Sequence, residues 1–308
     1  MILALAGGVG GARLARGLAA ILPPERLSII VNVGDDFEHL GLLICPDLDT
    51  MCYTLAGVNN AAQGWGLEGE SWAFMDALGR LGGETWFNLG DRDLATHITR
   101  RMRLGQETLS SITSHLAGQM GIAHRIAPMS DDPVRSMIDT DEGELAFQQY
   151  FVRRRAEPQF RSIRFEGIET ARPSPAFEAA LDHPELEAII FCPSNPVLSI
   201  APILALPGIR DRLARRTVPI VAVAPFIGGH AVKGPAAKIM REIGISTAPH
   251  GLVEYYGGLL DGVVIDTVDA REQQSIVTMH ATDILMRGLE DQQRLAGETI
   301  AFARSLRR

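Results

Sequence analysis

Cysteine is scarce in this sequence, and long apolar runs are absent from it. The 308 residues include three cysteines, and no two of them form a CxxC pair, so neither a disulfide framework nor a structural zinc site is indicated. The apolar run at residues 1–6 is too short for the core of a signal peptide. No run approaches the roughly 20 residues that span a bilayer. These absences predict a cytoplasmic protein with no membrane partner.

Positive charge is also in short supply. The chain has 29 Lys and Arg against 37 Asp and Glu, a net charge of -8, whereas a nucleic-acid surface needs a basic stripe. We therefore expect no nucleic-acid partner. A phosphorylated small molecule is compatible with this charge, because helix N-termini and a few local cations can hold a phosphate.

Several catalytic motifs are missing as well. The sequence contains no GxSxG, no HExxH and no GK[ST] of a phosphate-binding loop, and its eight histidines lack metal-ligand spacing. What the chain does have is a hydrophobic content of 46%, enough for a sizeable core in one large domain or two tightly joined ones.

The chain begins with the pattern of a doubly wound α/β fold. Residues 1–6 form an apolar run that ends at glycines, residues 12–22 place leucines on one helical face, and residues 27–33 form a second apolar run. This order predicts a Rossmann-like, mostly parallel sheet with helices on both faces. Later strands are expected at residues 186–192, 218–224 and 262–266, and helices at 207–216, 235–243 and 281–308.

The middle of the chain interrupts this alternation. Residues 72–81 and 94–121 have mainly helical patterns, and residues 147–167 are arginine-rich and extended. We therefore predict that residues 1–70 and 171–308 form the Rossmann-like core, and that residues 71–170 are an inserted, mainly helical region covering the open edge of the sheet.

A glycine loop lies between the first expected strand and the first helix. Gly8, Gly10 and Gly11 permit backbone conformations that other residues avoid, and the helix start beyond them offers free N–H groups to an anion. The spacing departs from GxGxxG, and a tight turn without a ligand is the structural alternative.

Paired aspartates follow the second expected strand. Asp35 and Asp36 come directly after it, and Asp47 and Asp49 come shortly afterwards. Both loops lie where a parallel sheet presents its ligand crevice, and clustered carboxylates there suit Mg²⁺. The alternative is helix caps and turns, which Asp favours, and this alternative is strongest for Asp47.

Three further loops carry polar or basic groups. Arg92 stands between two aspartates ahead of a helix, where it could orient a polar ligand or make an ordinary surface ion pair. Ser194 and Asn195 lie between two prolines after a buried strand and can donate hydrogen bonds to phosphate. Lys233 lies beside another helix start, where it could meet a phosphate or face water.

Several motifs occur together and in one order from Met1 to about Asp269: GGVGGAR, VNVGDD, ICPDLDT with YTLAG, WFNLGDRDLATH, FQQYFVRRR, PSNPVLSI and GGHAVKGPAAK. Together they resemble the 2-phospho-L-lactate transferase family (CofD family) of coenzyme F-420 biosynthesis.

The resemblance implies a Mg²⁺-dependent transferase. Such an enzyme moves a phospholactyl-type group from a guanosine diphosphate-activated organic acid to the hydroxyl of the deazaflavin Fo (7,8-didemethyl-8-hydroxy-5-deazariboflavin), and it releases GMP. Asp49 and Arg92 would contact Fo, and the inserted region 71–170 would cover it. The acid is phospholactate, phosphoenolpyruvate or phosphoglycerate, which the sequence does not distinguish, and a homodimer is compatible with the family.

Loop position and chemistry suggest the remaining roles. Asp36 and Asp49 are the predicted metal ligands, and Asp49 or Asp35 is the predicted catalytic base. Asp49 cannot readily be both a tight ligand and an effective base, so this choice stays open. The guanosine diphosphate part is expected at Gly8, Gly10, Gly11, Ser194, Asn195 and Lys233.

Two other functions compete with this one. A non-catalytic, nucleotide-sugar-binding regulator with a related Rossmann-like fold would share the glycine loop and the PSNP segment, but the GDRDLATH and FQQYFVRRR runs favour the transferase. An NAD-dependent oxidoreductase is disfavoured by the glycine spacing and by the VNVGDD sequence after the second strand.

Overall fold

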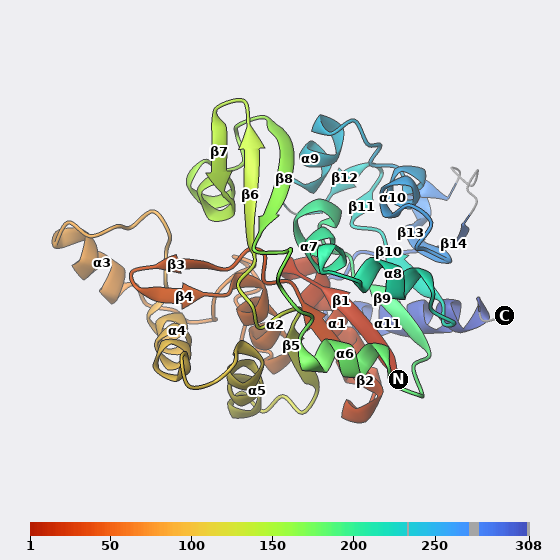
Figure 1. Ribbon diagram of the computed structural model, residues 1–308, viewed down its shortest axis with the longest axis horizontal. Helices are drawn as coiled ribbons and strands as arrows, with labels where there is room; N and C mark the ends of the chain where they lie inside the picture. The colour runs from red at the N-terminus through yellow and green to blue at the C-terminus, as the bar shows by residue number, and fades with distance from the viewer. Residues whose placement is uncertain (233, 271–276, 307–308) are drawn as a thin grey trace.

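The main sheet has seven parallel strands in the order β14-β13-β10-β9-β1-β2-β5 (Figure 1). The computed structural model describes residues 1–232, 234–270 and 277–306. The central strands are apolar and buried along their whole length, as parallel strands covered on both faces must be. The strands are β1 (Ile2–Ala6), β2 (Leu27–Val31), β5 (Arg125–Pro128), β9 (Ala188–Phe191), β10 (Ile220–Val223), β13 (Gly262–Asp266) and β14 (Thr278–Thr282).

Helices complete the core. On one face α1 (Gly8–Ile21) packs against α11 (Leu289–Ser305) so closely that a Cβ at Gly17 would lie 2.1 Å from the Gln292 carbonyl oxygen. Helix α6 (Pro175–Leu181) packs on β2 and β5. This arrangement confirms the predicted Rossmann-like α/β fold. The other core helices are α7 (Ala201–Ala205), α8 (Ile209–Ala214), α9 (Ala236–Glu242) and α10 (Pro249–Tyr256).

A second group of elements extends from the sheet on the side of β2 and β5 (Figure 1). It contains the hairpin of β3 (Phe37–His39) and β4 (Leu42–Ile44), and a small antiparallel sheet in the order β7-β6-β8. The strands of that sheet are β6 (Arg135–Thr140), β7 (Gly143–Ala146) and β8 (Phe160–Glu166). The helices along this part of the chain are α2 (Pro46–Ala56), α3 (Ala73–Arg80), α4 (Asp91–Arg103) and α5 (Leu109–Gln119); of these, α2 packs against α1, β2 and β5, and α5 packs against β5.

Several expected elements differ from the observed ones. The helical pattern at residues 94–121 is divided into α4 and α5 at Gly105, which has a φ of +93°. Of the expected extended segment at 147–167, the part Gln149–Arg153 is a π-helical turn and only β8 is a strand. The remaining short elements are β11 (Phe226–Ile227), β12 (His230–Ala231), the π-helical turn Pro196–Ile200 and the 3₁₀ turns Pro24–Arg26 and Thr267–Asp269.

Two strands of the main sheet were not expected. Strand β5 lies inside the region 71–170 that the sequence assigned to an insertion, yet it pairs with β2. Strand β14 pairs with β13, and the terminal helix predicted at 281–308 begins only at Leu289. Both strands are at the sheet edges, and their sequences RIAP and TMHAT lack a continuous apolar run, so neither has the pattern of a buried strand.

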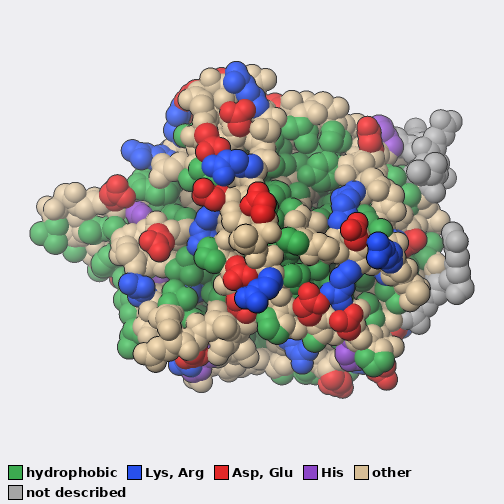
Figure 2. Space-filling view, in the orientation of Figure 1, with side chains coloured by type: hydrophobic (Ala, Val, Ile, Leu, Met, Phe, Trp, Pro, Cys, Tyr) green, Lys and Arg blue, Asp and Glu red, His purple; other side chains and the backbone are tan. Residues whose placement is uncertain are grey.

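The surface mixes charges of both signs. On the face seen in Figure 2, acidic and basic side chains are interspersed, and hydrophobic side chains gather at the projecting end that Figure 1 labels α3. Leu81, just after α3, is 87% exposed. Within the part of the chain that the structure describes, no helix combines the length and apolar character needed to cross a bilayer.

Candidate active site

The glycine loop and the loop after β9 meet where the strand order reverses. Strand β1 lies between β2 and β9, so the loops that follow β1 and β9 border the crevice where doubly wound sheets bind ligands. The Gly7 N–H donates a hydrogen bond to Ser194 Oγ at 3.0 Å. A Cβ at Gly10 would lie 2.3 Å from the Pro193 carbonyl oxygen, so this contact requires glycine.

The predicted nucleotide-binding side chains after β9 also have structural partners. Ser194 is buried and accepts the Gly7 N–H, and Asn195 Oδ1 accepts the N–H groups of Val197 at 3.0 Å and Leu198 at 3.1 Å. The Ser194 hydroxyl and the Asn195 amide keep donors of their own for a ligand. Their nucleotide-binding role stays a prediction, and Lys233 lies outside the described residues.

The start of α1 already holds a carboxylate. The Gly8 N–H donates to Asp47 Oδ1 at 2.7 Å, and Asn32 Nδ2 donates to Asp47 Oδ2 at 3.0 Å. Burial raises the pKa of Asp47 to about 6, against the opposing effect of these two hydrogen bonds. Asp47 therefore caps the N-terminus of α1, a helix other than its own, in line with the structural alternative given for it above. A phosphate bound at Gly8 would have to share the Gly8 N–H with Asp47.

Three other aspartates are buried close together beside this loop. Asp35, Asp36 and Asp49 are 6%, 3% and 6% exposed. Within residues 1–232, 234–270 and 277–306, the atoms Asp35 Oδ1, Asp36 Oδ1 and Asp49 Oδ2 have no hydrogen-bond partner. Buried polar atoms are rarely left unpaired, because each costs roughly 1–3 kcal/mol. The cluster is therefore suited to a positively charged ligand.

The pKa values of two of these carboxyl groups also show that burial disfavours their charged form. Burial raises the pKa of Asp35 well above its usual range, and the charge of Asp47 raises it further. Burial raises the pKa of Asp36 to about 7, although Arg135 and Arg100 lower it, and the charge of Asp49 adds to the rise. The charge of Asp49 therefore acts on Asp36. Their oxygen atoms fit Mg²⁺, which prefers hard oxygen ligands.

Arg100 is a basic residue in contact with this cluster, and no role for it was predicted from the sequence. It is 2% exposed on α4, and its guanidinium contacts the Asp49 carboxylate directly. It also donates to the Leu43 carbonyl oxygen at 3.1 Å. Arg100 therefore holds Asp49 Oδ1 in place, while Asp49 Oδ2 makes no hydrogen bond and lies 3.6 Å from His97 Nδ1.

A second cluster joins Asp49 on α2 to two residues of α4. Asp49, Asp93 and His97 each offer one ligand atom within 4.8 Å of the others, and all three are buried. However, His97 Nδ1 lies 3.1 Å from Arg100, and the Tyr53 hydroxyl donates to Asp93 Oδ1 at 2.6 Å. Because the Arg100 cation and these contacts occupy the cluster, it supports Asp49 better than it would hold a second cation.

The sequence contained a signal for this network. Asp93, His97 and Arg100 are spaced i, i+4 and i+7, which places them on one face of a helix. A buried helix face with alternating charge needs partners on the neighbouring helix. Asp49 and Tyr53 provide them, at i and i+4 of α2.

Arg92 lies apart from this buried network. Its side chain is exposed and donates to the Glu68 carbonyl oxygen at 2.9 Å, and its backbone N–H donates to Glu70 at 2.7 Å. Its neighbour Asp91 accepts the N–H groups of Ala73 and Phe74 at the start of α3. The GDRD motif therefore has a structural role here, and contact between Arg92 and a deazaflavin stays a prediction.

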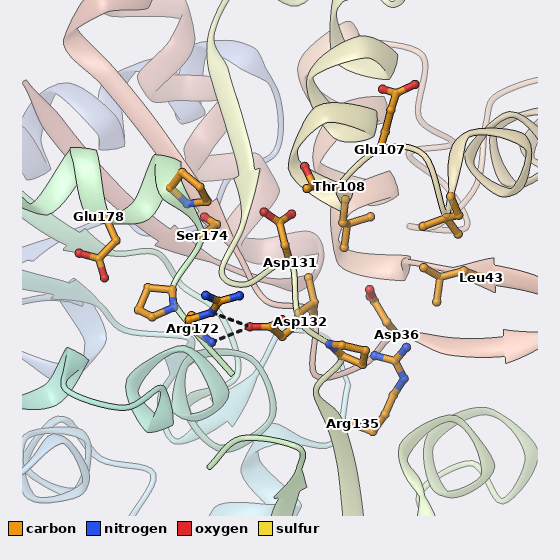
Figure 3. A pocket seen from close by; sticks show the side chains of 16 residues that line it. Asp36, Leu43, Glu107, Thr108, Asp131, Asp132, Arg135, Arg172, Ser174 and Glu178 are labelled. Atoms are coloured by element: carbon orange, nitrogen blue, oxygen red, sulfur yellow. Dashed lines mark hydrogen bonds and ion pairs between the residues drawn. The ribbon is translucent and has the colours of Figure 1, made fainter. Parts of the chain in front are cut away.

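A pocket of about 630 Å³ opens beside Asp36 (Figure 3). Asp36 and Arg135 lie at one side of it, and Asp131, Asp132 and Arg172 line the rest. The pocket is at the carboxyl ends of β2 and β5, next to the acidic cluster. It can accept a small ligand whose charged end reaches Asp36.

Comparison with known proteins shows which family this chain belongs to. A model of the family described as "2-phospho-L-lactate transferase CofD" matches residues 2–295. The chain belongs to the CofD family. It is 40% identical to a "Phosphoenolpyruvate transferase" of Streptomyces coelicolor, with 99% of each chain covered. It is 39% identical to a "2-phospho-L-lactate transferase" of Methanosarcina mazei, with 94% of this chain and 96% of that protein covered.

A CofD-family chain is a transferase, so the prediction of an enzyme of this class is confirmed over the regulator and the oxidoreductase. The resemblance to the family of coenzyme F-420 biosynthesis is confirmed with it. Among solved structures, a protein member of the UPF0052 family from Bacillus halodurans superimposes with a TM-score of 0.61 at 13% identity, covering 97% of this chain and 98% of that one. That likeness concerns the fold alone.

Proposed function

We propose that this CofD-family enzyme transfers a phosphate-linked organic acid from a guanosine diphosphate-activated donor to the hydroxyl of the deazaflavin Fo, and releases GMP. One observation carries the proposal. Three buried carboxylates, Asp35, Asp36 and Asp49, each have an unpartnered oxygen, and one of them, Asp36, lines a pocket of about 630 Å³ at the ligand edge of the sheet. This arrangement suits a metal-bound diphosphate that meets an alcohol.

Mg²⁺ would be held by Asp36 and Asp49. When bound there it would neutralise charge on the phosphate oxygens, which is the main requirement of phosphoryl transfer. Asp36 Oδ1 and Asp49 Oδ2 are buried without a hydrogen-bond partner, which supports their assignment as ligands. Arg100 fixes the orientation of Asp49 through its other oxygen.

The reaction is a displacement at phosphorus. The Fo hydroxyl oxygen attacks the phosphorus that carries the acid, the bond from this phosphorus to the bridging oxygen breaks, and GMP leaves with the electron pair. The hydroxyl proton passes to a carboxylate. We assign that role to Asp35 and not to Asp49, because Asp49 is tied to Arg100 while burial raises the pKa of Asp35.

The other parts of the substrates have expected places. Arg92 and the inserted region would contact Fo, and Gly8, Gly10, Gly11, Ser194 and Asn195 would face the guanosine diphosphate part. The acid would be phosphoenolpyruvate, phospholactate or phosphoglycerate, and the first two are favoured because relatives named for one or the other match this chain at 36–40% identity. The cytoplasmic location and the homodimer stay predictions.

Mass spectrometry tests the proposal directly. The enzyme is incubated with Fo, Mg²⁺ and each guanylated acid in turn, and the product mass identifies which acid was transferred. We expect a phosphodiester of Fo together with GMP. If Fo remains unmodified with every donor while the protein stays folded, the proposed reaction is wrong.

Asp49→Asn is expected to reduce turnover by at least a thousandfold, because the variant loses a metal-binding charge. It also leaves the buried Arg100 without its ionic partner, so unfolding should become easier by roughly 3–5 kcal/mol. Turnover and urea unfolding are measured on the same preparation.

Tyr53→Phe is the matched control. It removes the hydrogen bond to Asp93 at the same helix junction and costs roughly 1–3 kcal/mol, but it keeps Asp49. Near-normal turnover in this variant would separate the chemical role of Asp49 from stability. An equal loss of turnover in both variants would contradict that role.

A further inference from the structure

Arg135 is an uncommitted cation in the pocket beside Asp36. It lies on β6, is half-buried, and donates one hydrogen bond to the Val134 carbonyl oxygen at 2.8 Å. Among the described residues, no carboxylate forms an ion pair with it. Figure 3 shows its guanidinium directed toward Asp36 at the edge of the pocket. A guanidinium in this position is free to bind an anion.

The other charged groups that line the pocket already have partners. Asp132 lies 3.7 Å from Arg172, and Asp131 Oδ1 accepts the Ser110 N–H at 2.6 Å. Glu107 and Glu178 form ion pairs with Arg103 and Arg212, respectively. Of the cations that line the pocket in the described part of the chain, Arg135 is therefore the one without an ion pair, and it is next to the proposed metal ligand.

The chemistry of the donor says which anion belongs there. In phospholactate and phosphoenolpyruvate, one carbon separates the carboxylate from the ester oxygen on phosphorus. If that phosphate is held at Asp36, the carboxylate lies within a few ångströms of it, on the side where the pocket and Arg135 are. We propose that Arg135 binds the carboxylate of the donor's acid and so selects acid-bearing donors. This assignment rests on the proposed function.

A simpler role for Arg135 makes a different prediction. Arg135 lowers the pKa of Asp36 and could serve only to offset that charge. In that case its removal would weaken every guanosine diphosphate compound equally. Recognition of a carboxylate instead weakens only compounds that carry one.

The experiment measures binding of two compounds by calorimetry with Mg²⁺ present. One is guanosine diphosphate joined to lactate through the terminal phosphate, and the other is its ethyl counterpart, which lacks the carboxylate. The wild type should bind the lactate compound roughly ten- to a hundredfold more tightly, as expected for a charged hydrogen-bonded pair. Arg135→Gln should bind both compounds with the affinity that the wild type has for the ethyl compound.

Arg164→Gln is the matched control. Arg164 is on the adjacent strand β8 and is exposed in an ion pair with Glu144, so its loss should leave both affinities unchanged. Thermal unfolding checks that both variants fold. Equal affinity of the wild type for the two compounds would overturn the assignment, and so would an equal loss for both compounds in Arg135→Gln.

Failure of this inference can be told apart from failure of the proposed function. A carboxylate preference that depends on Arg135, with no conversion of Fo, would leave the binding assignment intact and refute the reaction. Conversion of Fo without that preference would refute the assignment alone.

Discussion

Asp36 is a carboxylate held in an environment that opposes its charge. It is buried, and burial raises its pKa to about 7 in spite of two nearby arginines. Protein folding alone does not favour such a group, since an apolar or amide side chain of the same size would fit without the penalty. A bound cation would offset the cost of burying the Asp36 carboxylate.

This gives a prediction for the metal-free protein. The pKa of Asp36 is raised in the folded state from its ordinary value of 3.8 to about 7, so its contribution to stability is complete below pH 4 and is lost as the pH rises to about 7. Asp36→Asn cannot ionise. It should match the wild type near pH 4 and exceed it at pH 8, by at most about 4 kcal/mol in urea unfolding.

The metal supplies the control for that experiment. Adding Mg²⁺ at pH 8 should stabilise the wild type and leave Asp36→Asn nearly unchanged, because binding to the folded state alone shifts the unfolding equilibrium. Parallel stability curves for the two proteins across this pH range would show that Asp36 is not strained by burial.

Between elements, the decisive contacts are between loops and helices that are distant in sequence. The loop after β1 touches the loop after β9 through Gly7, Gly10 and Ser194. Helices α2 and α4 are joined by the pair of Asp49 and Arg100. These contacts hold the acidic cluster beside the switch point of the sheet.

The contact at Gly10 can be tested with two alanine substitutions. Gly10→Ala would place a Cβ 2.3 Å from the Pro193 carbonyl oxygen, so the loops must move apart and stability should fall by roughly 1–3 kcal/mol. Gly118→Ala, on the exposed side of α5 with no atom within 4 Å, should be stabilising by roughly 0.5–1 kcal/mol. Urea unfolding measures both, and a Gly10→Ala variant as stable as the wild type would contradict the close approach of the loops.

At the scale of the whole molecule, the proposed ligand crevice lies at the carboxyl ends of β1 and β9, the paired strands from which the order of the sheet runs in opposite directions. Strands β1, β2 and β5 lie on one side of this point, and β9, β10, β13 and β14 lie on the other. A nucleotide that touches the loops after both β1 and β9 therefore adds contacts to both halves of one continuous sheet. Such a ligand should stabilise the fold as one cooperative unit.

Thermal unfolding with GDP tests this link. At a hundred times its Kd, GDP with Mg²⁺ should add about 2.7 kcal/mol of stability and raise Tm by roughly 4–6 °C. Chelation of the metal should remove most of this gain. The absence of any shift at millimolar GDP would contradict nucleotide binding at the switch point.

The sequence by itself determined the Rossmann-like sheet, the family and the acidic loop after β2, because each depends on contiguous residues; the second predicted acidic loop, with Asp47 and Asp49, is instead the first turn of α2. The buried runs at 1–6 and 27–33 form strands wherever a core exists, and Asp35 and Asp36 follow the second strand directly. The order of the motifs along the chain was enough to predict the family, which the family model confirms.

Only the tertiary structure decided which of these residues act together. It joined Asp49 to Arg100, gave Asp47 to the N-terminus of α1, and left Arg135 unpaired in a pocket. The edge strands β5 and β14 likewise owe their conformation to a neighbouring strand. The physical reason is that pairing, burial and pKa depend on distances between residues far apart in the chain, and local sequence patterns do not contain those distances.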